Sequence, residues 1–375
     1  MKRASGVLMP VFSLPSKYGI GCFSKEAYKF VDQLKKAGQS YWQILPLGPT
    51  GYGDSPYQSF STYAGNPYFI DLKTLVKEGL LTKKECKEVR CKEQKKIDYE
   101  KIYQNRFKIL KKAYRRFQKN DKYEKFLEEN AFWLEDYCMY MAIKDAHEGK
   151  SWSEWEELLK KREKTALEKV KEELEDEIGF YQFQQYEFDR QWKKLHTYAK
   201  EQGIQIIGDI PIYVAFDSAD AWAAPELFQF DEENNPIRVA GCPPDAFAKT
   251  GQLWGNPLYN WEYHQKTGYA WWIQRIRYCF QRYDVVRIDH FRGFDEYYAI
   301  PYGESTAENG TWMPGPGMKL FQAIEKELGR PEIIAEDLGF LTESVLQMLK
   351  ESGFPGMKVL QFAFDPSGES VYLPH

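Results

Sequence analysis

The stretch Val285-Val286-Arg287-Ile288-Asp289 constrains the fold more than any other part of the chain. Side chains alternate between the two faces of a strand, so Arg287 and Asp289 share one face with Val285, opposite Val286 and Ile288. Apolar residues on both faces are typical of a parallel strand covered by helices. Two charges near the end of such a strand need a partner or a chemical role. An internal Arg–Asp pair that caps the next loop and a catalytic aspartate both fit this pattern.

A strand–helix–strand unit near the N-terminus indicates the same fold class. Residues 6–14 predict a strand with an irregularity at Pro10, Ser24 begins a helix that ends at Gly38, and residues 41–47 predict a second strand. Two strands joined by a helix lie parallel. The remaining predicted strands are 204–210, 284–290, 332–337 and 357–364, and the later helices are 268–282, 317–329 and 342–352. We therefore expect an α/β fold of the (β/α)8 TIM-barrel type with helical and loop insertions.

Composition limits the class of protein and its compartment. The chain has 375 residues, 43% of them hydrophobic, which is enough for one large elaborated domain. Its formal net charge of -4 gives no general attraction to nucleic acid. Six scattered cysteines without a CxxC pair favour free thiols in a reducing compartment. Because no apolar run is long enough for a signal peptide or a membrane span, we predict a cytoplasmic protein without a nucleic-acid or membrane partner.

The middle of the chain predicts a helical insertion. Residues 73–122 are strongly basic and residues 123–178 are strongly acidic, and apolar residues recur there at helical spacing. We expect solvated helix faces of opposite charge that pair with each other. The predicted organisation is a barrel formed by 1–72 and 180–375, with 73–179 as a helical subdomain. The 215–265 segment is long enough to be a lid or binding loop.

Three successive predicted strands end in a carboxylate, namely Asp209, Asp289 and Glu336. The carboxyl ends of barrel strands meet at one mouth, where the chemistry of such folds takes place. Arg287 should keep Asp289 ionised, as a nucleophile or base requires. Asp337 should help to keep Glu336 protonated, as a general acid requires. Two carboxyls about 5 Å apart would suit a retaining glycosidic mechanism. No phosphate loop, HExxH motif or histidine ligand spacing occurs, so no metal or cofactor is predicted.

Residues 48–68 form a loop rich in glycine, aromatic and small polar residues. Two interpretations are open: the rings pack into the core, or they contact a sugar, which presents an apolar C–H face and a polar rim. The composition favours sugar contact.

The chain resembles the amylomaltases, or 4-α-glucanotransferases, a family related to the α-amylase clan. The resemblance runs from the first strand to the last residue. It is carried by LPLGPTGYGDSPYQSFSTYAGNPY (45–68), GDIPIYV (208–214), GCPPDAFAKTGQLWGNPLYNW (241–261), VVRIDHFRG (285–293) and IIAEDLG (333–339).

The resemblance implies a role for each matching residue. Asp289 would be the nucleophile that forms a covalent glucosyl-enzyme, Glu336 the acid/base, and Arg287 the residue that holds the nucleophile. Asp209 would contact the sugar on the donor side, and a lid with Asp245 and Trp254 would cover the acceptor side. Further substrate contacts are expected at Ser55, Tyr57, His290 and Phe362, and at Tyr52 as part of a secondary glucan-binding surface. No metal or organic cofactor is implied.

The sequence departs from the family pattern in one respect. The family's third catalytic carboxylate lies in a His-Asp pair just after the seventh barrel strand, and this sequence ends at His375, before that strand. We therefore expect a fragment with about six of the eight strands. The first and sixth strands would then be unpaired edges with exposed apolar surface.

The function that these observations indicate is transfer of α-1,4-glucan segments between maltooligosaccharides. An α-glucan hydrolase is a second interpretation, which the absence of longer products would favour. An α-glucan-binding protein without turnover is a third, because aromatic subsites can persist when the third carboxylate is absent.

Overall fold

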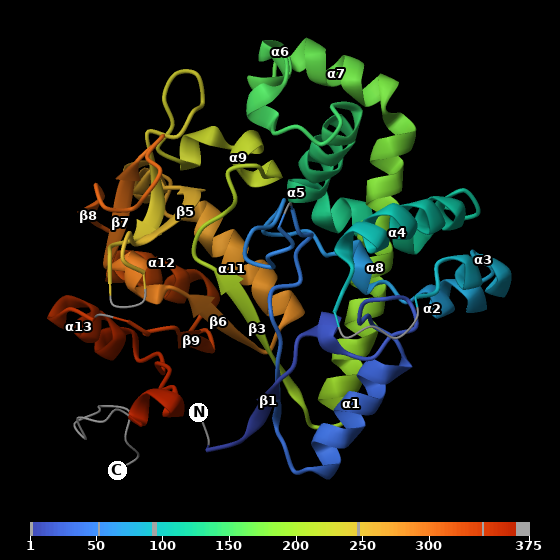
Figure 1. Ribbon diagram of the computed structural model, residues 1–375, viewed down its shortest axis with the longest axis horizontal. Helices are drawn as coiled ribbons and strands as arrows, with labels where there is room; N and C mark the ends of the chain where they lie inside the picture. Colours follow the sequence, from blue (N-terminus) through green and yellow to red (C-terminus); the bar gives the residue numbers. More distant parts are fainter. Residues whose placement is uncertain (1–2, 52, 92–95, 246–247, 340, 365–375) are drawn as a thin grey trace.

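The computed structural model describes residues 3–51, 53–91, 96–245, 248–339 and 341–364. At its centre is a parallel sheet in the strand order β1-β2-β3-β6-β9 (Figure 1). The strands are β1 (Gly6–Leu8), β2 (Tyr41–Gln43), β3 (Gln205–Pro211), β6 (Val285–Asp289) and β9 (Ile333–Ala335). All four pairings between neighbours are parallel, which confirms the fold class predicted from the strand–helix–strand pattern.

Helices connect the strands and cover the sheet. Ser24 caps α1 by accepting a hydrogen bond from the backbone N–H of Glu26, as its position predicts. The α-helices are α1 (Lys25–Lys36), α2 (Leu72–Lys77), α3 (Lys83–Glu88), α4 (Tyr99–Tyr114), α5 (Asp121–Ala146), α6 (Glu157–Lys160), α7 (Lys164–Glu173), α8 (Glu175–Glu201), α9 (Ala219–Ala223), α10 (Trp261–Lys266), α11 (Ala270–Arg282), α12 (Met318–Leu328) and α13 (Glu343–Ser352). Across the described ranges, no helix is both long and apolar enough to cross a membrane.

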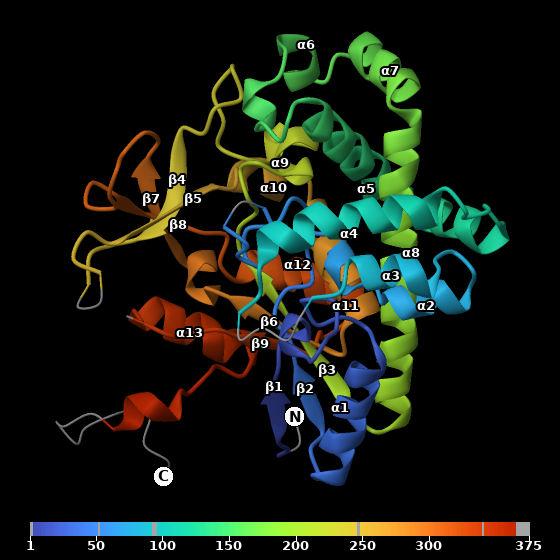
Figure 2. The same ribbon diagram turned by 45° about the vertical axis from the view of Figure 1, so that its right-hand side comes forward.

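The 215–265 segment contains regular structure that its sequence did not reveal. With the strands that follow β6, it builds a second, antiparallel sheet in the order β5-β4-β7-β8, at one side of the parallel sheet in Figures 1 and 2. These strands are β4 (Arg238–Cys242), β5 (Gln252–Pro257), β7 (Glu296–Pro301) and β8 (Thr311–Pro314). The segment expected to form a lid, 215–265, is therefore hydrogen-bonded through β4 to β7, within residues 296–314.

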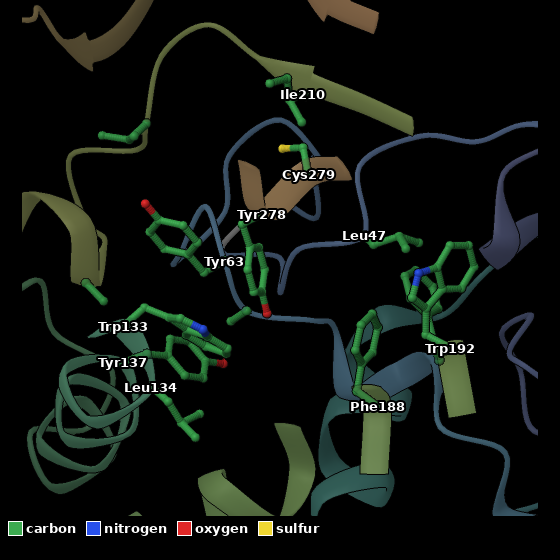
Figure 3. Packing of buried hydrophobic residues seen from close by; sticks show 14 of the residues in the cluster. Leu47, Tyr63, Trp133, Leu134, Tyr137, Phe188, Trp192, Ile210, Tyr278 and Cys279 are labelled. Atoms are coloured by element: carbon green, nitrogen blue, oxygen red, sulfur yellow. The ribbon is translucent and has the colours of Figure 1, made fainter. Parts of the chain in front are cut away.

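The helical insertion shares one hydrophobic core with the rest of the fold. Tyr63, Trp133 of α5 and Tyr278 of α11 meet in Figure 3, with ring centroids 5.3 Å apart for Tyr63–Tyr278 and 6.1 Å for Tyr63–Trp133. Helix α8 also runs continuously across the predicted boundary at residue 179. Lys111 of the basic half pairs with Asp176 of the acidic half at 2.7 Å, as the charge pattern predicts.

The strands predicted at 41–47 and 332–337 are shorter in the structure, Tyr41–Gln43 and Ile333–Ala335, and two other strand predictions differ more. The first strand is only Gly6–Leu8, and Val11–Ser13 forms a 3-10 helix directly after Pro10, which lacks an N–H for the ladder. The strand predicted at 357–364 is wrong, because Leu360–Ala363 is a 3-10 helix, η6. The backbone N–H of Met357 donates to Asp337 Oδ1, and no neighbouring strand receives it. Within the described residues the parallel sheet is open, with β1 and β9 as its edges.

Candidate active site

Three adjacent parallel strands bring the predicted carboxylates together. In the register, Asp209 of β3 lies opposite Arg287 of β6, and Ile288 lies opposite Ala335 of β9. Asp289 and Glu336 each follow that last pair by one residue, so they lie at the same level at the carboxyl ends of neighbouring strands. Figure 1 shows β3, β6 and β9 side by side. The sequence prediction is confirmed for Asp289 and Glu336, whereas Asp209 lies two residues before the end of β3 and is in register with Arg287, not with Asp289.

A chain of hydrogen bonds and ion pairs joins four of the predicted site residues. Tyr57 Oη donates to Asp209 Oδ2 at 2.7 Å, and Arg287 Nη1 lies 2.7 Å from Asp209 Oδ1. The other terminal nitrogen, Arg287 Nη2, lies 2.8 Å from Asp289 Oδ1. One guanidinium therefore bridges two carboxylates. The Asp289 side chain is 35% exposed, against 1% for Asp209, so Asp289 is the one that a ligand can approach.

Burial dominates the electrostatics of Asp209. It raises the pKa of this carboxyl from its usual 3.8 to about 6, although Arg287 and the hydroxyl of Tyr57 both oppose the rise. Asp209 thus carries its negative charge at neutral pH only because these two partners stabilise it.

Glu336 has an environment that favours the protonated form. Burial raises its pKa and the nearby charge of Asp289 adds to the rise, while the backbone N–H groups of Leu338 and His290 oppose it. Those N–H groups donate to Glu336 Oε1 at 2.7 Å and Oε2 at 2.8 Å. The structure gives a different cause for the rise from the one expected, because Asp337 turns to Met357 and Lys358.

His290 directly follows Asp289 in the chain, and one nitrogen of its ring is unpaired. Its backbone has a left-handed conformation with φ 54°, which is uncommon for a residue with a side chain. Burial, helped by the charge of Arg292, lowers the pKa of the imidazole to about 3, so the ring is neutral. Its Nε2 is buried without a hydrogen-bond partner, and its ring meets Trp254 edge-on at 4.8 Å between centroids.

The remaining predicted contacts lie in different places. Ser55 accepts a hydrogen bond from the backbone N–H of Tyr57, so it shapes the loop that delivers that ring. Asp245 is exposed on the β4–β5 connection and accepts from the backbone N–H of Ala248. Phe362 is 49% exposed on η6, which lies beyond β9 and α13 in Figures 1 and 2. Tyr52 falls outside the described residues.

Part of the loop at 48–68 packs into the core, as the first interpretation predicts, and contact of its other rings with a sugar stays a prediction. Tyr63 and Tyr68 are buried in the hydrophobic core, whereas Tyr57 reaches Asp209. Sequence reasoning missed Met357, whose sulfur accepts from Arg287 Nε at 3.1 Å. No local signal points to that contact, because 70 residues separate the two side chains.

The arrangement can support a two-carboxylate reaction. Asp289 is held by an arginine and accessible, while neighbouring Glu336 is buried with a raised pKa. This difference in environment is what separates a nucleophile from a general acid in retaining glycosidic chemistry. Among the residues described, no group of three or more His, Cys, Asp or Glu could hold a metal ion.

Comparisons with known proteins point to one family. The 4-alpha-glucanotransferase family model matches residues 9–375. The 4-alpha-glucanotransferase of Clostridium butyricum is 52% identical over 371 residues, which are 98% of this chain and 76% of that protein. That of Thermus thermophilus is 47% identical over all of this chain and 75% of its own length.

Solved structures give the same result for the fold. The amylomaltase from Streptococcus agalactiae, in complex with acarbose, matches with a TM-score of 0.97 and 44% identity over 100% of this chain and 77% of that one. The amylomaltase from Corynebacterium glutamicum, at 19% identity, shares the fold with a TM-score of 0.77 over 97% of this chain and 52% of that one. With its three carboxylate-bearing strands and this similarity along its whole length, the chain belongs to the 4-alpha-glucanotransferase family.

Proposed function

We propose that this protein transfers α-1,4-glucan segments between maltooligosaccharides by a retaining double displacement. The observation that carries the proposal is the contrast between Asp289, which Arg287 holds from 2.8 Å, and Glu336, whose pKa burial raises. The Streptococcus agalactiae amylomaltase, solved with acarbose, supports a carbohydrate substrate. The six cysteines are free, and five of them are buried, which is compatible with the cytoplasm as the place of action.

In the first step, a carboxylate oxygen of Asp289 attacks the anomeric carbon of the donor glucan. The bond from that carbon to the leaving O4 breaks, and Glu336 donates its proton to O4. Arg287 holds the Asp289 carboxylate in position before the attack, and Asp209 keeps the guanidinium in place. The products of this step are a glucosyl ester on Asp289, a shortened glucan and an ionised Glu336.

In the second step, the 4-hydroxyl of an acceptor sugar attacks the glucosyl ester. Glu336 takes the hydroxyl proton, the ester bond to Asp289 breaks, and both carboxyls return to their initial states. Transfer exceeds hydrolysis when a sugar occupies the acceptor side before water does. Trp254, beside the unpaired His290 nitrogen, is the aromatic surface that we assign to the acceptor sugar.

Other contacts complete the proposed binding site. We assign donor-side contacts to Asp209, Tyr57 and Ser55, and acceptor-side contacts to Asp245 on the lid. Phe362 and Tyr52 are proposed contacts with more distant parts of the glucan chain. No cofactor takes part in the proposed reaction.

The proposal is tested by incubating the protein with maltotriose and separating the products by length. We expect glucose together with a ladder of longer oligosaccharides. Asp289→Asn removes the nucleophile but keeps its shape, so it should abolish transfer and leave glucan affinity largely intact, as measured by calorimetry. Near-normal turnover by this variant, or products that are never longer than the substrate, would refute the proposal.

A further inference from the structure

We propose that Asn256 is a positioning residue for the transfer reaction, which couples the acceptor-side strand β5 to the loop that carries Tyr57. The inference rests on the function proposed above and adds to it a link between the two sides of the site. No part of the chemistry described so far uses Asn256 or its partner Gln58.

The amide of Asn256 joins three chain segments that are distant in sequence. Its Nδ2 donates to the backbone carbonyl of Val214 at 2.7 Å and to Gln58 Oε1 at 3.4 Å. Its Oδ1 accepts from Gln58 Nε2 at 3.0 Å. Gln58 and Asn256 thus form a reciprocal pair of amides, with the second Nδ2 hydrogen directed to the segment after β3. Asn256 is 5% exposed, so water does not compete strongly for these bonds.

Only an amide can make this set of contacts. Nδ2 provides two hydrogens and Oδ1 one acceptor, and all three are used. An aspartate of the same shape would offer no donor and would turn a charged oxygen towards the Val214 carbonyl. An aliphatic side chain would leave the Val214 carbonyl and the Gln58 amide without these partners.

Two of the three segments that Asn256 joins carry a site residue close by. Tyr57, next to Gln58, donates to Asp209, and Asp209 in turn fixes the arginine that holds Asp289. Trp254, two residues before Asn256, packs against His290. Strand β5 is an edge of the antiparallel sheet, paired with β4 in the described structure, and the amide ties this edge strand to the segment that follows β3 of the parallel sheet. A shift at Asn256 therefore moves both Trp254 and Tyr57.

The test compares three variants of the whole protein. Asn256→Asp keeps the side-chain shape and removes both donors. Gln58→Ala removes the amide pair from a half-buried position and leaves the bond to Val214 intact, so it should fold even if Asn256→Asp does not. Asn130→Ala is the matched control, because Asn130 is 6% exposed and makes two amide hydrogen bonds within α5, to Phe126 and Trp133.

Two measurements decide the outcome. With maltotriose, Gln58→Ala and Asn256→Asp should lower kcat about 10- to 100-fold with little change in KM, since small misplacements of reacting groups cost about this much. Asn130→Ala should keep the parent kcat. Amide hydrogen exchange should become faster in both 53–60 and 252–257 in each of the two site variants, whatever their activity.

Parent-like kcat in folded Gln58→Ala or Asn256→Asp would overturn the coupling, as would an equal loss in Asn130→Ala. Faster exchange in only one of the two segments would also overturn it. If the parent protein itself makes no longer products, the proposed transfer fails. The exchange measurement then still decides whether Asn256 couples the segments.

Discussion

Replacing Asp209 by asparagine should make the stability of the protein less dependent on pH. Burial raises the pKa of Asp209 from 3.8 to about 6 in the folded state, and the residue is 1% exposed. The difference of about 2.2 pKa units, at about 1.36 kcal/mol per unit, corresponds to about 3 kcal/mol. Asparagine keeps the shape and an acceptor for Arg287 but cannot ionise.

The direction of the stability change depends on whether Asp209 ionises first in the folded or in the unfolded chain. Below about pH 4, Asp209 is protonated in both the folded and the unfolded chain, so its titration costs nothing. Between about pH 4 and pH 6 the unfolded chain loses its proton first, and the folded state becomes relatively less stable. Above about pH 6 the folded state has lost the full amount of stability, about 3 kcal/mol. The parent should therefore lose about 3 kcal/mol relative to Asp209→Asn as the pH rises from 4 to 7.

Urea denaturation of both proteins at several pH values between 4 and 7 measures this difference. Asp284→Asn is the control with the opposite sign. Burial raises the Asp284 pKa, but His196 and the backbone N–H of Ile206 outweigh it and lower the pKa overall. The parent gains this stability below about pH 4, so Asp284→Asn should lower the stability by an amount that hardly changes between pH 4 and 7. Parallel curves for the parent and Asp209→Asn across this range would refute the reasoning.

Two further predictions concern Glu336 and a buried anchor of the Tyr57 loop. Glu336→Gln should lower turnover about 10²- to 10⁴-fold. It should also abolish the fall in kcat/KM that the parent shows as pH rises through the raised Glu336 pKa, and a pH–rate profile with an unchanged alkaline limb would contradict this role. Thr62→Val removes the 2.5 Å bond from Thr62 Oγ1 to buried Asp220 and should cost about 1–3 kcal/mol in urea denaturation. Thr306→Val, at an exposed bond to Glu308, should be close to neutral; equal losses would contradict the assignment.

The candidate site divides into a part that local pattern predicts and a part that it does not. Arg287 and Asp289 lie two residues apart on one strand, so their shared face and their ion pair follow from strand geometry alone. The contact between Tyr57 and Asp209 joins residues 152 positions apart. No periodicity reports such a contact, although the composition of the loop indicated that some of its rings would meet a ligand site.

The acidity of Glu336 shows why a sequence neighbour is a poor guide to electrostatics. Asp337 is adjacent in the chain, but both residues follow the end of β9, and the Asp337 carboxylate accepts hydrogen bonds from the backbone N–H of Met357 and from Lys358 Nζ. Burial and Asp289, on another strand, raise the Glu336 pKa in its place. Both causes depend on how β6 and β9 pair and on what covers them.

The sequence by itself determined the parallel α/β fold, the position of Asp289 and Glu336 at the carboxyl ends of their strands, and the family, because these depend on local periodicity and on long matching motifs. The tertiary structure decided the antiparallel sheet β5-β4-β7-β8, the 3-10 helix at Leu360–Ala363 and the amide link through Asn256. It also decided which carboxyl is exposed and which is buried. Such features arise from contacts between segments far apart in the chain, and from the removal of water that those contacts cause.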